Sequence, residues 1–253
     1  MELLKYLQLK RLTGSDASIF LTNYAFKLIN GIKAVSTHKI IHHGIDPIFF
    51  EISNYIKRNI SIDRPVTCIY VSNAAPYKHQ WVVIEAISRL REMTGLDIRL
   101  DLIGARSGQS ASRVLVATER FDPAGTFVRV VDFLAHDEVP QAIAAADIFV
   151  FASSCENLPI TLLEGMASGL PIACSDRGPM TEVLGDGGVF FDPENPGSIS
   201  DAIGKIIFDT VLRNNISQVA RDRARKFTWE SCSEQTWKFL SEIARRNIVN
   251  AHV

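Results

Sequence analysis

Short apolar runs alternate with segments of helical periodicity over residues 65–208 of the chain. The runs predict strands at 66–72, 99–104, 127–131, 148–152, 171–175 and 188–191. Helices are predicted at 80–93, 110–121, 137–146, 159–168, around 181, and at 199–208. The strands are mostly apolar runs rather than alternating patterns, as expected for strands buried on both faces of a parallel sheet. Alternating strands and helices therefore predict an α/β fold with a doubly wound parallel sheet.

The two ends of the chain follow a different pattern. Helices are predicted at 2–12 and from Asn23 to Ile29, with short strands at 17–22 and 39–42. Residues 46–63 are polar and irregular, and 229–247 form an amphipathic helix with two tryptophans. We therefore predict an N-terminal remnant at 1–45, a linker at 46–64, the main domain at 65–227 and a C-terminal helix at 228–253.

The composition excludes several classes of protein. Of 253 residues, 47% are hydrophobic, so the chain is not intrinsically disordered. The formal net charge of -1 gives no overall positive field for binding nucleic acid. No apolar stretch approaches the roughly 20 residues that span a bilayer. The four cysteines form no CxxC pair and are interpreted as thiols of a cytoplasmic protein, although a reactive Cys155 stays open.

Residues 153–171 (SSCENLPITLLEGMASGLP) carry the strongest chemical signal. They follow an apolar strand and begin a helix at Pro159. The free backbone N–H groups in the first turn of this helix would form an anion site. Glu156 would precede this helix and Glu164 would lie within its apolar sequence, where an acid needs partners. The plain alternative is that the two acids are a cap and a solvated helix residue.

These residues resemble the retaining glycosyltransferases of family 4. Glu156 and Glu164 have the E-x7-E spacing, and 162–176 (LLEGMASGLPIACSD) resembles the block that follows it. Further matches in the same order are 41–46 (IHHGID), 70–79 (YVSNAAPYKH), 102–104 (LIG), 178–182 (GPMTE), 187–193 (GGVFFDP) and 227–230 (FTWE). The resemblance implies one Rossmann-like half of a GT-B fold, which binds the donor, plus the tail of the acceptor half.

The resemblance also implies roles for particular residues. Lys78 would neutralise the diphosphate of a nucleoside-diphosphate sugar, and Glu156 would lie at the transferred hexosyl group. Glu164 would bind the ribose. Further residues would contact the diphosphate (Asn73, Ile160 and Thr161) or border the base (Gly104, Val131, Phe133 and Leu134). Glu182 is as consistent with a structural role as with a functional one, and His79 could contact a phosphate.

The sequence departs from the family pattern in three ways. Asn73 stands where the family has an arginine, which leaves Lys78, the helix N-terminus and either Arg106 or Arg177 to bind the diphosphate. Residues 157–159 (NLP) replace a glycine-rich stretch. Both variants resemble bacterial polysaccharide mannosyltransferases, which favours GDP-mannose over UDP-sugars as the donor. Most of the acceptor domain is absent, so the chain is interpreted as a fragment, as the product of a truncated reading frame or as a subunit that needs a partner.

The resemblance therefore implies transfer of a hexosyl group, with retention, to a glycan or lipid-linked acceptor. No metal and no cofactor are expected. Peripheral association with the inner face of the membrane and self-association through the C-terminal helix are further expectations. The alternative is a module that binds a nucleotide sugar without turnover.

Overall fold

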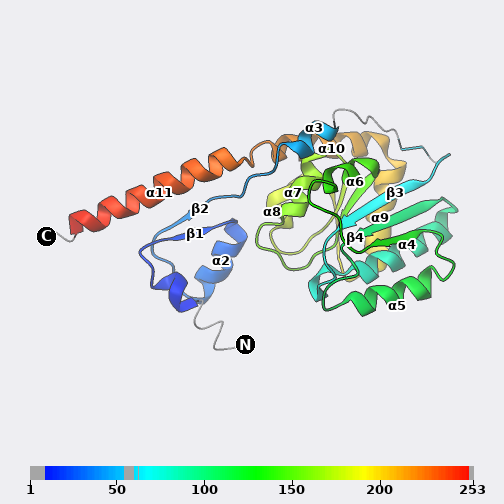
Figure 1. The fold of residues 1–253 in the computed structure, drawn as a ribbon, viewed down its shortest axis with the longest axis horizontal. Coiled ribbons are helices and arrows are strands. Elements are labelled where there is room, and N and C mark those ends of the chain that lie inside the picture. The colour runs from blue at the N-terminus through cyan, green and yellow to red at the C-terminus, as the bar shows by residue number, and fades with distance from the viewer. Residues whose placement is uncertain (1–8, 54–59, 62, 251–253) are drawn as a thin grey trace. The chain divides into compact units, whose positions relative to one another are not determined.

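The computed structural model describes residues 9–53, 60–61 and 63–250 (Figure 1). The chain divides into two compact units. Unit 1 contains the residues up to Ile45 and those from Phe227 onward, and unit 2 contains Asp46–Lys226.

Unit 2 is built on a parallel sheet, which confirms the predicted α/β fold. In the described part of the chain the sheet has six strands in the order β5-β4-β3-β6-β7-β8. The strands are β3 (Val66–Val71), β4 (Ile98–Ile103), β5 (Val128–Val131), β6 (Ile148–Phe151), β7 (Ile172–Ser175) and β8 (Val189–Phe191). The helices are α3 (Ile48–Ser53), α4 (Gln80–Thr94), α5 (Ala111–Phe121), α6 (Val139–Ala145), α7 (Ile160–Ala167), α8 (Met180–Leu184), α9 (Pro196–Phe208) and α10 (Thr210–Ala224).

Helices cover both faces of this sheet. Helix α4 packs against α5 and α9, whereas α7 packs against α3 and α10 (Figure 1). The central strand β6 is buried along its whole length, as a run of apolar residues between two helical layers requires. Gly165 of α7 permits close contact with this strand, because a Cβ there would lie 2.7 Å from the ring of Phe149.

Two helices in unit 2 differ from the sequence prediction. Residues 48–53, predicted as part of an irregular linker, form α3, which packs on α6 and α7. Residues 210–224, for which no helix was predicted, form α10. Asp209 begins α10 by accepting a hydrogen bond from Leu212 N–H at 2.9 Å. Both helices pack on α7, which holds them against the sheet of unit 2.

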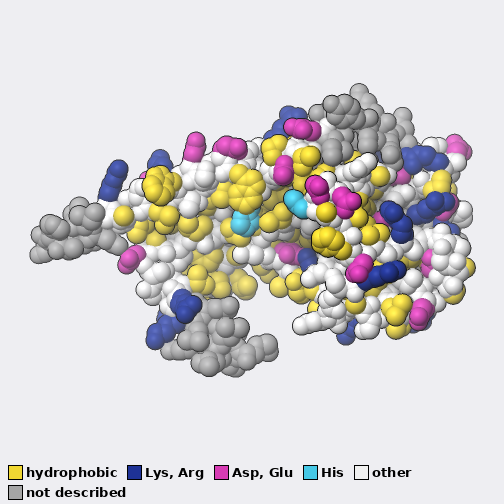
Figure 2. Space-filling view, viewed as in Figure 1, with side chains coloured by type: hydrophobic (Ala, Val, Ile, Leu, Met, Phe, Trp, Pro, Cys, Tyr) yellow, Lys and Arg dark blue, Asp and Glu magenta, His cyan; other side chains and the backbone are white. Residues whose placement is uncertain are grey.

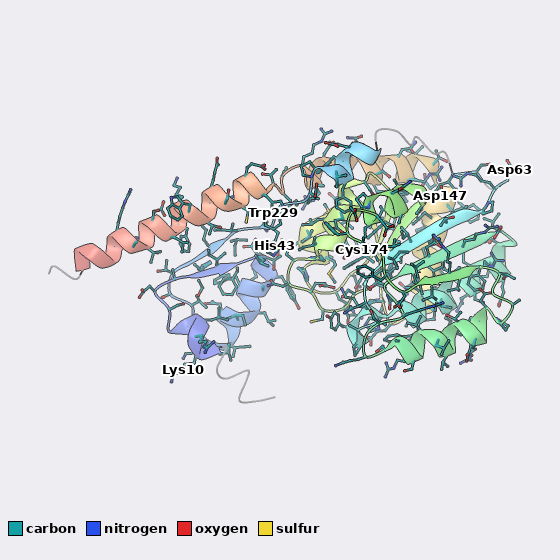
Figure 3. The ribbon with its side chains drawn as sticks, viewed as in Figure 1. Lys10, His43, Asp63, Asp147, Cys174 and Trp229 are labelled. Atoms are coloured by element: carbon teal, nitrogen blue, oxygen red, sulfur yellow. The ribbon has the colours of Figure 1, made fainter. Side chains whose placement is uncertain are left out.

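Unit 1 contains a small parallel sheet and helices. Strands β1 (Ser18–Phe20) and β2 (His38–Ile40) pair in parallel, and they accompany α2 (Asn23–Ile32) and α11 (Trp229–Asn250). Thr22 caps α2 by accepting a hydrogen bond from Ala25 N–H at 3.2 Å. The rings of His43 and Trp229 lie 5.7 Å apart and join the two chain segments of this unit (Figure 3). Residues 9–13 are helical, and the rest of the predicted helix at 2–12 lies outside the described residues.

Large apolar side chains of unit 1 are exposed to solvent. Trp237 is 75% exposed and Leu240 is 51% exposed, so α11 carries an uncovered apolar stripe (Figure 2). On α2, Leu28 and Ile32 are both more than half exposed. None of the helices in the described ranges is both long enough and apolar enough to cross a bilayer.

Candidate functional site

The order in which the chain adds strands to the sheet reverses between β3 and β6. From β3 the chain moves outward to β4 and β5, and it then returns to place β6 on the other side of β3. Parallel α/β sheets bind ligands at such a switch point, where loops diverge to opposite sides. The two loops that begin there contain Lys78, after β3, and Glu156, after β6.

Lys78 and Glu156 form an ion pair at the carboxyl edge of the sheet. Lys78 Nζ lies 2.5 Å from Glu156 Oε1, and the two side chains are only 11% and 16% exposed. The ammonium also lies 5.4 Å from the ring centroids of Tyr77 and Phe151, within the range of a cation–π contact. Lys78 is therefore held at this edge of the sheet by Glu156 and two aromatic rings and is not a solvated loop lysine.

The backbone around Lys78 is fixed by hydrogen bonds from two directions. Tyr70, fully buried in β3, donates its hydroxyl to the carbonyl oxygen of Lys78 at 2.8 Å. The backbone N–H of Ser154 donates to the carbonyl oxygen of Tyr77 at 2.8 Å, which ties the β6 loop to the β3 loop. Sequence reasoning missed these contacts; the one signal was a tyrosine within an apolar strand, whose hydroxyl needs a partner.

Helix α7 begins beside Glu156 with its first N–H groups uncapped by any side chain. The N-cap residue is Pro159, whose ring carries no hydrogen-bond acceptor. Ile160 is 43% exposed and Thr161 is half-buried. Two of the residues predicted to contact the diphosphate, Ile160 and Thr161, therefore lie in the first turn of α7. Free N–H groups and the helix dipole attract an anion there.

Glu164 is a buried acid, as its apolar helix suggested. It is 5% exposed, and within the described residues its carboxylate makes no ion pair or hydrogen bond to another side chain. Burial raises the pKa of Glu164 to about 6, with the charge of Asp46 adding to this and that of His136 opposing it. The reading of Glu164 as a solvated helix residue is therefore wrong.

The residues predicted to border the base lie at the ends of β4 and β5. Gly104 has φ +83°, and a Cβ at this position would lie 3.0 Å from the carbonyl oxygen of Ser72. Glycine is therefore required where β4 turns against the β3 loop. Val131 ends β5, and beyond it Phe133 is 80% exposed while Leu134 is half-buried.

The other candidates differ in what surrounds them. Asn73 is exposed at the end of β3, and Arg106 is exposed with no ion pair within the described ranges. Arg177 is already paired with Asp192 at 3.0 Å and with a neighbouring aspartate, so Arg106 is the freer cation. The carbonyl oxygen of Glu182 accepts a hydrogen bond from an arginine of α10, which is a structural contact.

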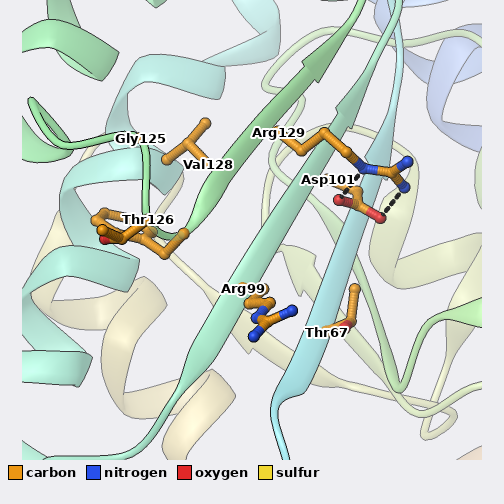
Figure 4. A pocket seen from close by; sticks show the side chains of 8 residues that line it. Thr67, Arg99, Asp101, Gly125, Thr126, Val128 and Arg129 are labelled. Carbon is orange, nitrogen blue, oxygen red and sulfur yellow. Dashed lines mark hydrogen bonds and ion pairs between the residues drawn. The ribbon is translucent and has the colours of Figure 1, made fainter.

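The remaining observations concern the cysteines, groups of metal-binding side chains and a cavity. All four cysteines are free thiols: Cys68 and Cys174 are buried, Cys155 is exposed and Cys232 is intermediate. Among the described residues, no three His, Cys, Asp or Glu side chains are grouped so as to hold a metal ion. A cavity lies over β4 and β5, away from the Lys78–Glu156 ion pair (Figure 4), and its Arg129 is already bound to Asp101 at 2.5 Å.

Comparison with solved structures gives the same fold. Over 97% of this chain and 63% of the other, the structure matches sucrose-phosphate synthase from Thermosynechococcus elongatus with a TM-score of 0.81 and 17% identity. It matches Anabaena HepE in complex with UDP and glucose with a TM-score of 0.75 and 18% identity, over 90% of this chain and 63% of that one.

Comparison with curated sequences is more specific. The chain is 29% identical to the O-antigen chain mannosyltransferase B of Escherichia coli, over 66% of this chain and 44% of the relative. It is 26% identical to a D-inositol 3-phosphate glycosyltransferase of Nocardioides sp., over 78% of this chain and 47% of the relative. The chain thus spans about half the length of these relatives. Residues 52–223 match the family model described as glycosyl transferases group 1, and the chain belongs to that family.

Proposed function

We propose that this chain is the donor-binding part of a retaining hexosyltransferase that uses a nucleoside-diphosphate sugar. The single observation that supports this proposal most is the pairing of Lys78 with Glu156 beside the uncapped start of α7. A lysine ammonium and a helix N-terminus are two features that bind phosphates, and here they lie in adjacent loops of one sheet edge.

The diphosphate would replace Glu156 as the main partner of Lys78. During transfer, the bond between the anomeric carbon and the diphosphate oxygen breaks, and that oxygen keeps the electron pair. The oxygen of an acceptor hydroxyl forms the new bond to the anomeric carbon, and its proton passes to the departing diphosphate. Lys78 and the N–H groups of Ile160 and Thr161 stabilise the negative charge that develops there. Glu156, released from its ion pair, faces the sugar, where positive character builds. This charge balance needs no metal ion.

Glu164 would bind the ribose of the donor. A buried carboxylate without partners is costly, and two ribose hydroxyls would donate the hydrogen bonds that the protein does not supply. The base would lie against Gly104, Val131, Phe133 and Leu134, of which Phe133 offers an exposed ring.

The proposed donor and acceptor are inferred from the relatives of this chain. The E. coli relative is named O-antigen chain mannosyltransferase B, which favours GDP-mannose and a glycan or lipid-linked acceptor. The Anabaena structure holds UDP and glucose, so UDP-sugars are the competing donors. Four free thiols fit a reducing compartment such as the cytoplasm.

The second candidate is a binding module that holds a nucleotide sugar without transferring it. The observation that favours it is the coverage of about half the length of the relatives. Incubation of the chain with labelled GDP-mannose and UDP-glucose, with oligosaccharide acceptors, separates the two. Transfer of sugar with the anomeric configuration retained supports the enzyme. Tight donor binding without transfer supports the module, and inversion of configuration contradicts the retaining mechanism.

A further inference from the structure

His79, which follows Lys78, has an unusual backbone conformation. Its φ is +49°, and it is the sole non-glycine residue with positive φ within the described ranges. For an L-residue this left-handed conformation costs on the order of 1–2 kcal/mol, and it persists where the surroundings impose it. His79 also begins α4, because its carbonyl oxygen accepts a hydrogen bond from Val82 N–H at 2.9 Å. The strained residue therefore joins the Lys78 loop to a rigid helix.

The side chain of His79 contacts the loop that contains Glu156. His79 Nε2 lies 2.8 Å from Ser154 Oγ, and His79 is only 7% exposed. Ser154 Oγ also lies 3.4 Å from the carbonyl oxygen of Tyr77, which can take the hydroxyl hydrogen and leave a lone pair of Oγ to accept from Nε2–H. Together with the bond from Ser154 N–H to the same carbonyl, two links join these loops beside the ion pair.

We propose that His79 is a positioning residue, whose hydrogen bond to Ser154 holds Lys78 opposite the diphosphate of the donor. This inference rests on the proposed function and adds to it a residue that does not touch the donor. Lys78 precedes His79 by one position and Glu156 follows Ser154 by two, so the link lies at the base of the ion pair. A rigid base reduces the freedom that the long lysine side chain must lose when it binds a phosphate.

The hydrogen bond from His79 to Ser154 orients the Lys78 loop but adds no charge to the site. Burial is the main cause that lowers the pKa of His79 below 6.5, so the imidazole is neutral at neutral pH and adds no cation to the site. The hydroxyl of Tyr70 donates to the carbonyl oxygen of Lys78 independently of this link. Without the link, the loop would loosen while the fold persists.

The test measures how much the diphosphate contributes to binding, separately from the rest of the nucleotide. Affinities for a nucleoside diphosphate and for the corresponding nucleoside are measured by calorimetry, and their ratio reports the contribution of the phosphates. Ser154→Ala removes the acceptor without altering the backbone, and His79→Asn suits the left-handed conformation but is too short to reach Ser154. His79→Gln places an amide N–H near the position of Nε2 and serves as the conservative variant. Ser112→Ala, at an exposed position on α5, is the matched control.

We expect Ser154→Ala and His79→Asn to lower the ratio about fivefold, the loss expected for one hydrogen bond, with the nucleoside affinity unchanged. His79→Gln should recover most of the ratio, and Ser112→Ala should match the wild type. An unchanged ratio in both variants, or an equal loss for diphosphate and nucleoside, overturns the positioning role. A wild-type protein that does not distinguish diphosphate from nucleoside overturns the proposed function itself, and the positioning role with it.

Discussion

Replacing Glu164 by glutamine should stabilise the unliganded protein and weaken its binding of nucleotides. Glutamine keeps the shape of the side chain but removes the charge that burial disfavours. The pKa of Glu164 rises from 4.5 to about 6 on folding. At about 1.36 kcal/mol per pKa unit, the buried charge costs about 2 kcal/mol of folding stability.

The sign of the effect follows from the direction of the shift. A carboxyl group whose pKa is raised by folding costs nothing below its unfolded pKa of 4.5, because it is protonated in both states. The cost grows as the pH rises from 4.5 toward about 6 and is complete above that value. Glu164→Gln should therefore gain about 2 kcal/mol at about pH 7.5, and less than about 1 kcal/mol at about pH 5.

Urea unfolding, followed by tryptophan fluorescence at both pH values, measures this gain. Glu119→Gln, on the exposed side of α5, removes a surface carboxylate and should change the free energy of unfolding by less than about 0.5 kcal/mol. In calorimetry, Glu164→Gln should weaken the binding of a nucleoside diphosphate at least about tenfold, since the ribose hydroxyls lose a charged acceptor.

Either half of this result can refute the reasoning. If Glu164→Gln lowers the free energy of unfolding at about pH 7.5, the carboxylate has partners within the protein that stabilise its charge. If the variant gains stability but binds the nucleotide as the wild type does, Glu164 does not face the ribose.

Three further predictions concern other parts of the molecule. Glu156→Gln removes the carboxylate that competes with the diphosphate for Lys78. It should raise the affinity for a nucleoside diphosphate, measured by calorimetry, about fivefold, while the rate of sugar transfer falls. A fall in affinity would contradict the replacement of Glu156 by the diphosphate as the partner of Lys78. Asp122, which accepts hydrogen bonds from three consecutive backbone N–H groups, has a lowered pKa because these bonds outweigh its burial. Asp122→Ala should cost about 2 kcal/mol in urea unfolding above pH 3.8 and less as the pH falls below it; an equal cost at all pH values is the contrary outcome. Trp237→Ser should reduce self-association in sedimentation velocity, because Trp237 is 75% exposed on α11, and a monomeric wild type refutes this.

Much of the fold could be predicted because buried parallel strands leave a strong pattern in the sequence. Each of the six predicted strands of unit 2 is present within one residue of its predicted ends. Helix α10 was missed because its buried face contains Arg213, whose guanidinium donates to the carbonyl oxygen of Ile206 at 2.9 Å. A charged residue in that position hides the apolar periodicity on which the prediction depends.

The candidate site was predictable in its residues but not in its contacts. The spacing of Glu156 and Glu164 and the position of Lys78 came from a resemblance to known motifs. The ion pair of Lys78 with Glu156 joins residues 78 positions apart, and the bond from His79 to Ser154 joins residues 75 positions apart. Such contacts follow from the order of the strands in the sheet, which no local pattern encodes.

The claim that Lys78 and the start of α7 bind a diphosphate is tested most directly by calorimetry of GDP, UDP and ADP with the wild type and Lys78→Ala. Lys226→Ala, a change at the end of unit 2 outside the site, is the matched control. The account predicts that at least one nucleotide binds the wild type, and that Lys78→Ala alone weakens it about tenfold or more. Equal affinities for the wild type and Lys78→Ala would contradict the account.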